Sequence, residues 1–165
     1  MEASGNARFI GCVAYNNTWS QIKCTSALTV YKCVAYNPGD IAATHIIELG
    51  SGSSGGILAT TIDGDNATNS NGIQMTTEAN SVVIDSILYD CPTAVNASGT
   101  LWFDSLQMYN LLNSNTTDYS DTPSICTGYQ DVTSAPAFTD EAGDDYTLCD
   151  SSPAIDAGLQ PGGIT

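Results

Sequence analysis

The sequence contains one five-residue stretch twice without change: Cys12-Val13-Ala14-Tyr15-Asn16 returns as Cys33-Val34-Ala35-Tyr36-Asn37. The two copies begin 21 positions apart. A period of this length is typical of proteins that are built from stacked structural units. The repeat therefore predicts a column of stacked strands, and equivalent segments should follow along the chain.

The tyrosine of the repeat serves as a marker for weaker copies further along. The equivalent positions, 20 to 27 residues apart, are Tyr15, Tyr36, Asp63, Tyr89 and Tyr109. A large apolar residue stands six positions before each marker, at Phe9, Val30, Ile57, Val83 and Phe103. A mostly small residue stands three positions before it, at Cys12, Cys33, Thr60, Ser86 and Leu106. These columns indicate a true repeat.

Each unit has the β-branched, alternating character of a strand and ends in a residue that accepts a left-handed turn. These turn residues predict a stack at one corner, formed by Asn16, Asn37, Gly64, Asp90 and Asn110. A second short strand recurs between the blocks, marked by Ile22, Ile46, Ile73 and Val95. We therefore predict an all-β fold, a parallel β-solenoid of about five rungs. A β-sandwich also uses many short strands, but it gives no reason for a fixed period.

The pattern stops after Asn110, so we predict rungs over residues 1–110 and a loop and irregular C-terminal cap segment of the same domain over 111–165. The cap contains Pro136-Ala137-Phe138, Asp145-Tyr146-Thr147-Leu148 and Ser152-Pro153-Ala154-Ile155-Asp156-Ala157-Gly158. This succession resembles the closing segment of right-handed parallel β-helix proteins of the pectate-lyase-like superfamily, and the repeated block resembles their rungs. The resemblance implies a right-handed parallel β-helix. It leaves the function open, because such proteins include lyases, hydrolases, adhesins and phage tailspikes.

The charge balance restricts the partners. The 165 residues carry a net charge of −15, with Arg8, Lys23 and Lys32 as the three Lys and Arg residues. We therefore expect no nucleic-acid binding, which needs cations to neutralise phosphates, and no docking on anionic membranes. No apolar run is long enough to span a bilayer, and the first residues do not resemble a signal peptide. We expect an extracellular or virion-surface location that is reached without such a signal.

Few residues suggest chemistry. Asp63 and Asp65 could face a groove as the carboxylate pair of a glycosidase, although an Asp-Gly turn at a corner also explains them. Trp19 and Tyr31 are candidates for stacking on sugar rings if they point outward. The cations form no cluster of the kind that a polysaccharide lyase requires. We therefore predict no catalytic residue and lean against an enzyme.

An acidic turn and the cysteines complete the candidate sites. Asp140, Glu141, Asp144 and Asp145 offer oxygen ligands suited to calcium, which is the one cofactor that we consider. Cys126 and Cys149 flank the cap and are the first candidates for a disulfide. Cys12 and Cys33 occupy equivalent positions in adjacent rungs, where either a disulfide or a stack of reduced thiols is plausible.

The sequence favours a non-enzymatic structural or adhesive β-helix module on an extracellular surface, with a virion component such as a capsid decoration or fibre protein as the first example. The first rung of a solenoid is an open sheet edge. We therefore expect it to dock to a larger protein assembly or to form a homo-oligomer. The alternatives are a carbohydrate-binding or carbohydrate-active domain with a polysaccharide as partner, and a cell-surface or extracellular-matrix structural protein.

Overall fold

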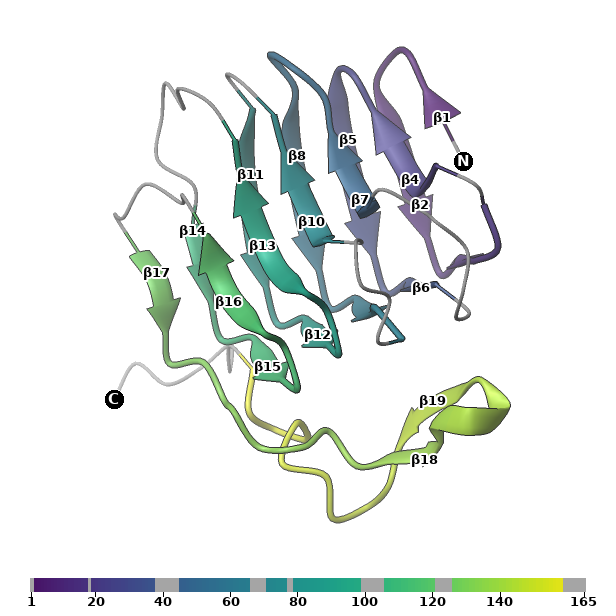
Figure 1. Cartoon of the computed structure of the whole chain (residues 1–165), viewed down its shortest axis with the longest axis vertical. Coiled ribbons are helices and arrows are strands. Elements are labelled where there is room, and N and C mark those ends of the chain that lie inside the picture. The colour runs from purple at the N-terminus through teal and green to yellow at the C-terminus, as the bar shows by residue number, and fades with distance from the viewer. Residues whose placement is uncertain are drawn as a thin grey trace.

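The computed structural model describes residues 2–17, 19–37, 45–65, 71–76, 79–98, 106–120 and 126–158. Its strands form three parallel sheets (Figure 1). Sheet A contains, in spatial order, β1 (Glu2–Ala3), β4 (Ser20–Cys24), β7 (His45–Leu49), β10 (Asn71–Met75), β13 (Thr93–Ala97) and β16 (Thr117–Ser120). Sheet B contains β2 (Ala7–Ile10), β5 (Ala27–Tyr31), β8 (Ser54–Leu58), β11 (Asn80–Ile84), β14 (Leu106–Met108) and β17 (Cys126–Tyr129). Sheet C contains β3 (Val13–Ala14), β6 (Val34–Tyr36), β9 (Thr61–Asp63), β12 (Ile87–Tyr89) and β15 (Leu111–Asn113).

The chain visits the three sheets in the same order each time, so one strand of each sheet makes a rung. Within the described residues the strands from β1 to β15 make five complete rungs, and β16 and β17 begin a sixth. Val132 continues sheet C there through an isolated parallel bridge to Leu111. The structure confirms the predicted all-β parallel solenoid, and its sheets extend beyond residue 110.

The core fills the space between the three sheets. Aligned apolar side chains point inward from each sheet, because alternate residues of a strand face opposite sides. In sheet A the buried column consists of Ile22, Ile47, Ile73 and Val95, so that Ile47 rather than the predicted Ile46 aligns with its neighbours. In sheets B and C the equivalent columns include Val30, Ile57 and Val83, and Ala35, Ile62 and Leu88. The core is thus a stack of similar layers.

The corner between sheets B and C repeats one backbone conformation in every rung. The residue that turns the corner has a positive φ, between 47° and 61°, at Gly11, Lys32, Ala59, Asp85, Tyr109 and Gln130. The residue that follows is small or polar, and these residues form the column Cys12, Cys33, Thr60, Ser86, Asn110 and Asp131. The left-handed turn sets the side chain of this second residue against the preceding rung.

Hydrogen bonds connect this column from rung to rung, and we call it the corner ladder. In four pairs a backbone N–H donates to the side chain of the following rung. The pairs are Cys12 to Cys33 Sγ at 3.4 Å, Thr60 to Ser86 Oγ at 3.3 Å, Ser86 to Asn110 Oδ1 at 3.1 Å and Asn110 to Asp131 Oδ1 at 2.7 Å. The ladder satisfies backbone donors that the turn removes from the sheets, where an unpaired buried group would be unfavourable.

The ladder corrects the predicted register of the fifth rung. Tyr109 and Asn110 were matched to the Tyr-Asn pair of the repeat, but the structure pairs Tyr89 with Asn113 and Val83 with Gln107. The fifth rung is therefore displaced by four residues from the prediction, and Phe103 lies outside the described residues. The physical reason is that Asn110 occupies the corner ladder, where it accepts one hydrogen bond from Ser86.

The other predicted corner lies between sheets C and A. Asn16, Asn37, Gly64 and Asp90 follow the strands of sheet C there, as predicted, with positive φ at Asn16 and Asp90. Because of the shifted register, Ser114, with a φ of 59°, takes the place that was predicted for Asn110.

Replacing Asn110 should test the corner ladder. Asn110→Ala removes the acceptor for Ser86 N–H and the donor to the Val83 carbonyl at 3.1 Å, both buried. Each unsatisfied buried group typically costs about 1–3 kcal/mol, so we expect a loss of roughly 2–4 kcal/mol in urea unfolding. The matched control is Asn113→Ala, whose amide donates to Thr133 in an exposed bond. Equal losses in the two variants would contradict the ladder.

Candidate functional site

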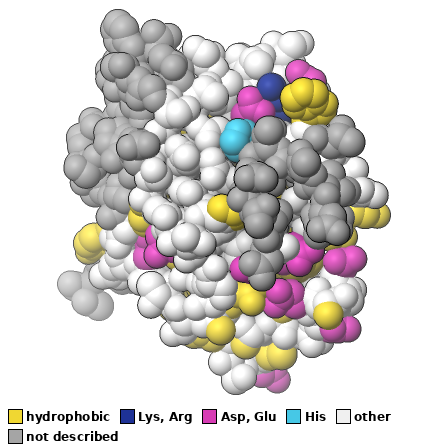
Figure 2. Space-filling model, viewed as in Figure 1, with side chains coloured by type: hydrophobic (Ala, Val, Ile, Leu, Met, Phe, Trp, Pro, Cys, Tyr) yellow, Lys and Arg dark blue, Asp and Glu magenta, His cyan; other side chains and the backbone are white. Residues whose placement is uncertain are grey.

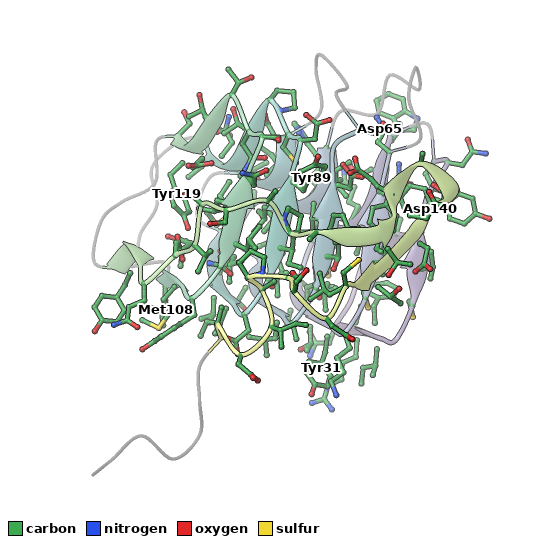
Figure 3. All side chains as sticks on the ribbon, turned by 90° about the horizontal axis from the view of Figure 1, so that it is seen from below. Tyr31, Asp65, Tyr89, Met108, Tyr119 and Asp140 are labelled. Atoms are coloured by element: carbon green, nitrogen blue, oxygen red, sulfur yellow. The ribbon has the colours of Figure 1, made fainter. Side chains whose placement is uncertain are left out.

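The chain after the last rung folds back across the outside of sheet C, and we call residues 133–158 the strap. It contains the antiparallel hairpin β18 (Phe138–Asp140) and β19 (Asp145–Leu148), which the short 3-10 helix η1 (Glu141–Gly143) connects. Figure 3 shows the strap crossing the stacked sheets, with Asp140 on the hairpin and Asp65 on the rungs beside it. The strap therefore connects rungs that are distant in the sequence.

Aromatic rings fix the hairpin on the rungs. The Tyr146 ring lies 5.2 Å from that of Tyr36, which stacks in turn on Tyr15 at 5.1 Å. The Phe138 ring contacts Tyr89 edge-on at 5.7 Å and Tyr146 at 5.2 Å. Such aromatic pairs contribute about 0.5–1.5 kcal/mol each beyond their buried area. Two of the marker tyrosines, Tyr36 and Tyr89, thus form the surface that the hairpin contacts.

One hydrogen bond joins the hairpin to the third rung. Tyr146 Oη donates to Asp63 Oδ2 at 2.8 Å, and the backbone N–H of Asp65 donates to Asp63 Oδ1 at 2.8 Å. Asp63 is only 1% exposed. Both carboxylate oxygens of Asp63 therefore accept hydrogen bonds within the protein, and the carboxylate is shielded from solvent.

A cavity of about 540 Å³ lies between the corner after β9 and the hairpin. Its lining consists of Asp63, Asp65, Glu141, Ala142, Asp144 and Tyr146. Four of these six residues carry carboxyl groups, so we call it the acidic cavity. On the surface, Asp and Glu side chains gather over the same hairpin region (Figure 2).

The electrostatics of Asp63 follow from its environment. Burial raises the pKa of Asp63 to about 6, because the charged carboxylate loses its contact with water. The hydrogen bonds from Asp65 and Tyr146 oppose this shift. The negative charges of Glu141 and Asp65 add to it. At neutral pH the closed strap therefore holds a mostly charged Asp63 carboxylate close to further acids.

The predicted calcium ligands are divided by the hairpin geometry. Asp140 accepts a hydrogen bond from Gly143 N–H at 3.2 Å, and Asp145 accepts two from Thr147, which lower the pKa of Asp145. These two carboxylates hold the hairpin turn together. Glu141 and Asp144 instead line the acidic cavity, where the fold adds Asp63 and Asp65. Among the described residues, no group of three or more His, Cys, Asp or Glu side chains has an arrangement suited to a metal ion. Calcium binding stays a prediction.

The segment that resembles a family closing motif packs under the rest of the strap. Ser152 Oγ donates to the Pro136 carbonyl and accepts from Ala154 N–H at 3.2 Å, which joins the two ends of the strap. Gly158 lies so close to the fourth rung that a Cβ there would be 2.8 Å from Asp85 Oδ1. A second cavity of about 360 Å³ remains between this segment and sheet C.

The carbohydrate candidates do not all meet at one place. Asp63 and Asp65 line the acidic cavity, whereas Trp19 and Tyr31 do not. Trp19 is 74% exposed and precedes β4, and Tyr31 ends β5 with Lys32 Nζ 5.2 Å from its ring centroid. Both aromatic residues thus lie at the N-terminal end of the stack. Sugar binding by these residues stays a prediction.

The disulfide predictions also remain open. Cys12, Cys33 and Cys149 carry free thiols in the structure, and the side chain of Cys126 lies outside its described part. Cys12 and Cys33 are neighbours in the corner ladder, and burial raises the pKa of the Cys33 thiol. A raised pKa disfavours the reactive thiolate. The choice between a disulfide and a stack of reduced thiols at Cys12 and Cys33 therefore stays a prediction.

Sequence reasoning missed a polar cluster on sheet A. Glu48 forms an ion pair with Lys23 at 2.9 Å and accepts a hydrogen bond from Ser20 Oγ at 2.9 Å. Burial raises the pKa of Glu48, but these two partners outweigh it and the net shift is downward. Burial also lowers the pKa of His45, which stands opposite Ser20 in the sheet. The register of sheet A pairs Lys23 with Glu48. The predicted alignment of Ile22 with Ile46 would place Lys23 opposite Ile47 instead, which is why the cluster was missed.

Comparisons with family models, with curated proteins and with solved structures find no match to this chain. In the part of the chain that the structure describes, we find no helix with the length and apolarity to cross a bilayer. The fold and the strap geometry therefore carry the functional argument.

The raised pKa of Asp63 predicts how stability depends on pH. A carboxyl group whose pKa is about 6 when folded and 3.8 when unfolded stabilises the protein at low pH, and this contribution is lost as the pH rises through 6. Its size is roughly 2–3 kcal/mol. Asp63→Asn mimics the protonated group, so the variant should lose stability less than wild type between about pH 4 and 7 in urea unfolding. Parallel pH profiles for the two proteins would contradict the assignment.

The calcium prediction is tested at the acidic cavity. If calcium binds there, its addition should raise the thermal unfolding midpoint of the wild type, and Glu141→Gln with Asp144→Asn should abolish the rise. Asp150→Asn is the control, because Asp150 is exposed and does not line the cavity. A midpoint that is the same with calcium and with a chelator would exclude the site.

Proposed function

We propose that this chain is a non-enzymatic structural module that docks to a protein assembly through its first rung, on an extracellular or virion surface. The observation that carries the proposal is the condition of that rung. Within the described residues, no strand pairs with the outer edges of β1, β2 and β3. An exposed sheet edge of this kind is a template for pairing with another chain.

The side chains of the first rung support docking. Ile10 is 60% exposed and Val13 is 58% exposed, and Tyr15 is also exposed. In the second rung the equivalent of Tyr15 is Tyr36, which the strap covers and which is buried. Of the two equivalent tyrosines, the strap therefore covers Tyr36 and leaves Tyr15 exposed. Ile10 and Val13, in the same first rung as Tyr15, are exposed as well, and the three side chains form an apolar strip. We call Ile10, Val13, Tyr15 and the edges of β1, β2 and β3 the head face.

The strap supports a structural role for the acidic residues. Asp63 has the shifted pKa that a glycosidase acid needs, but it is buried and both of its oxygens accept hydrogen bonds from the protein. The hydrogen bond from Tyr146 gives Asp63 a structural role, which is to attach the strap to the third rung, and this role accounts for its burial without a catalytic function. A carbohydrate-active domain and a cell-surface or matrix protein remain the alternative functions.

We also propose a relationship to the pectate-lyase-like superfamily. The support is that the residues of the resembling segment act together: Ser152 binds the Pro136 carbonyl, and Gly158 packs against the fourth rung. This proposal concerns ancestry and fold, and it assigns no activity.

Sedimentation velocity tests the docking proposal. The wild-type chain should sediment increasingly faster than a monomer as its concentration rises, because the head face is available. Val13→Asp places a charge on that face and should reduce the association. Ala135→Asp is the matched control, since Ala135 is exposed on the strap. A monomer at every concentration, or equal effects of the two variants, would count against docking. Cleavage of acidic or neutral polysaccharides would overturn the non-enzymatic assignment.

A further inference from the structure

The outer side of sheet B carries an apolar stripe that runs along the whole stack. In β5, Leu28 and Val30 are buried, so Tyr31, which alternates with them, faces outward. The strand registers place one outward apolar residue of each rung beside the next. We call this column the side stripe, and it consists of Ile10, Tyr31, Leu58, Ile84, Met108 and Tyr129. Figure 3 shows the labelled Tyr31 and Met108 on the same side of the stack.

The side stripe is accessible to a partner. Ile10, Tyr31 and Tyr129 are exposed, and so is Val82 in the neighbouring outward column of β11. Sheet A differs, because its corresponding outward column is polar and consists of Lys23, Glu48, Gln74, Asn96 and Ser120. Single exposed apolar residues are ordinary, whereas a continuous row of them marks an interaction surface.

The distribution of charge favours this side for a contact between two copies of the chain. The six strands of sheet B contain no Asp or Glu, although the chain has 18 of these residues and a net charge of −15. Two copies repel each other through their acidic surfaces. The repulsion is weakest where the surfaces that approach each other carry no acids.

The stripe can pair with itself around a twofold axis that runs parallel to β8. Such an axis keeps the direction of the strands and reverses the order of the rungs. Tyr31 of one copy then faces Ile84 of the other, and Ile10 faces Met108. Gly56 lies on the axis and faces outward, where an added Cβ would meet no atom of its own chain within 4 Å. The two sheets can therefore approach closely at the centre of the contact.

The same axis separates the cations on this side. Lys32 of one copy lies opposite the fourth-rung corner of the other, which Asp85 occupies, and Arg8 lies opposite the fifth rung. A twofold axis along the stack would instead set equal rungs against each other and bring the two Arg8 side chains together. The charges thus favour the axis parallel to β8.

The size of the contact predicts its strength. Five rungs of each copy overlap, with strands about 4.8 Å apart and residues about 3.3 Å apart along a strand. This spacing gives a flat area of roughly 24 by 15 Å, or about 360 Å², to which the protruding side chains add. A standard interface buries about 800 Å² on each partner, and transient ones bury less. We therefore expect a weak, reversible contact.

We propose that the side stripe binds the side stripe of a second copy of this chain around a twofold axis parallel to β8, which gives a side-by-side dimer. The contact is isologous and closes on itself. It is separate from the proposed docking through the head face and does not depend on it. Ile10 belongs to both surfaces, whereas Val13 and Tyr15 do not belong to the stripe.

Salt distinguishes this contact from one that is held by opposite charges. The measurement is sedimentation equilibrium of Val13→Asp, in which the head face is blocked and the stripe is intact. We expect the dissociation constant of the dimer to fall several-fold between about 20 mM and about 500 mM salt, because salt screens the repulsion between two acidic copies. A dissociation constant that rises with salt would contradict the apolar contact.

A charge placed on the stripe, and a charge pair across it, test the arrangement. In the Val13→Asp background, Val82→Asp places a carboxylate inside the apolar contact and should raise the dissociation constant at least about tenfold. Ala135→Asp, on the strap, is the matched control and should leave it unchanged. Thr29 of one copy faces Val82 of the other around the proposed axis. Adding Thr29→Lys to Val82→Asp sets opposite charges against each other and should restore most of the affinity.

The outcomes separate the dimer from the docking function. If Val82→Asp behaves as Ala135→Asp does, the stripe is not an interface and the dimer proposal fails. If Val82→Asp weakens the dimer and Thr29→Lys does not restore it, the copies meet in another arrangement and the proposed axis is wrong. Loss and recovery together support the proposal. Docking through the head face is judged by Val13→Asp against wild type, so either proposal can fail while the other stands.

Discussion

The structure depends on the corner ladder between sheets B and C. A left-handed residue turns the chain in every rung. The residue that follows it accepts a hydrogen bond from a backbone N–H of the rung before it at Cys33, Ser86, Asn110 and Asp131. Ser86 and Asn110 show why this position tolerates Cys, Thr, Ser, Asn and Asp: each is small and offers a side-chain acceptor. A one-residue slip between strands would turn every inward side chain outward. The same slip would also break the ladder hydrogen bonds, so the ladder helps to fix the register of the sheets.

The sequence was sufficient to predict the fold class and the register of sheets B and C in the first four rungs, because Val30, Ile57 and Val83 repeat an apolar residue at one place. In sheet A the prediction was one residue off in the third rung, where Ile47 rather than Ile46 faces the core column. The sequence was misleading at the fifth rung. Gln107 replaces the apolar residue of that column, and Tyr109-Asn110 imitates the Tyr-Asn pair of the repeat although it belongs to the other corner. The pairing of Tyr89 with Asn113 and the hydrogen bond from Ser86 to Asn110 identify the correct position, and a pattern of hydropathy carries no such information.

The candidate site could be predicted only in parts. The sequence predicts Asp63 and Asp65 as carbohydrate-site residues and Glu141 and Asp144 as calcium ligands, so it assigns the two pairs to different ligands. Nothing in the sequence indicates that Tyr146 reaches Asp63 across 83 positions. The strap brings these acids together, because the acidic hairpin packs on the corner that carries Asp63 and Asp65. Aromatic contacts stabilise this packing, whereas repulsion between the carboxylates destabilises it. A proton on Asp63 relieves this opposition, which makes the strap contact more favourable in acid.

These features describe a scaffold whose side is closed by its own strap. The central claim is that the corner ladder, rather than the strands alone, holds the rungs in register. Native-state hydrogen exchange tests it most directly. The account predicts that the amides of Thr60, Ser86 and Asn110, which lie outside regular strands, exchange as slowly as the amides within β11 and β12. Exchange as fast as at the exposed hairpin turn, Glu141–Gly143, would contradict it.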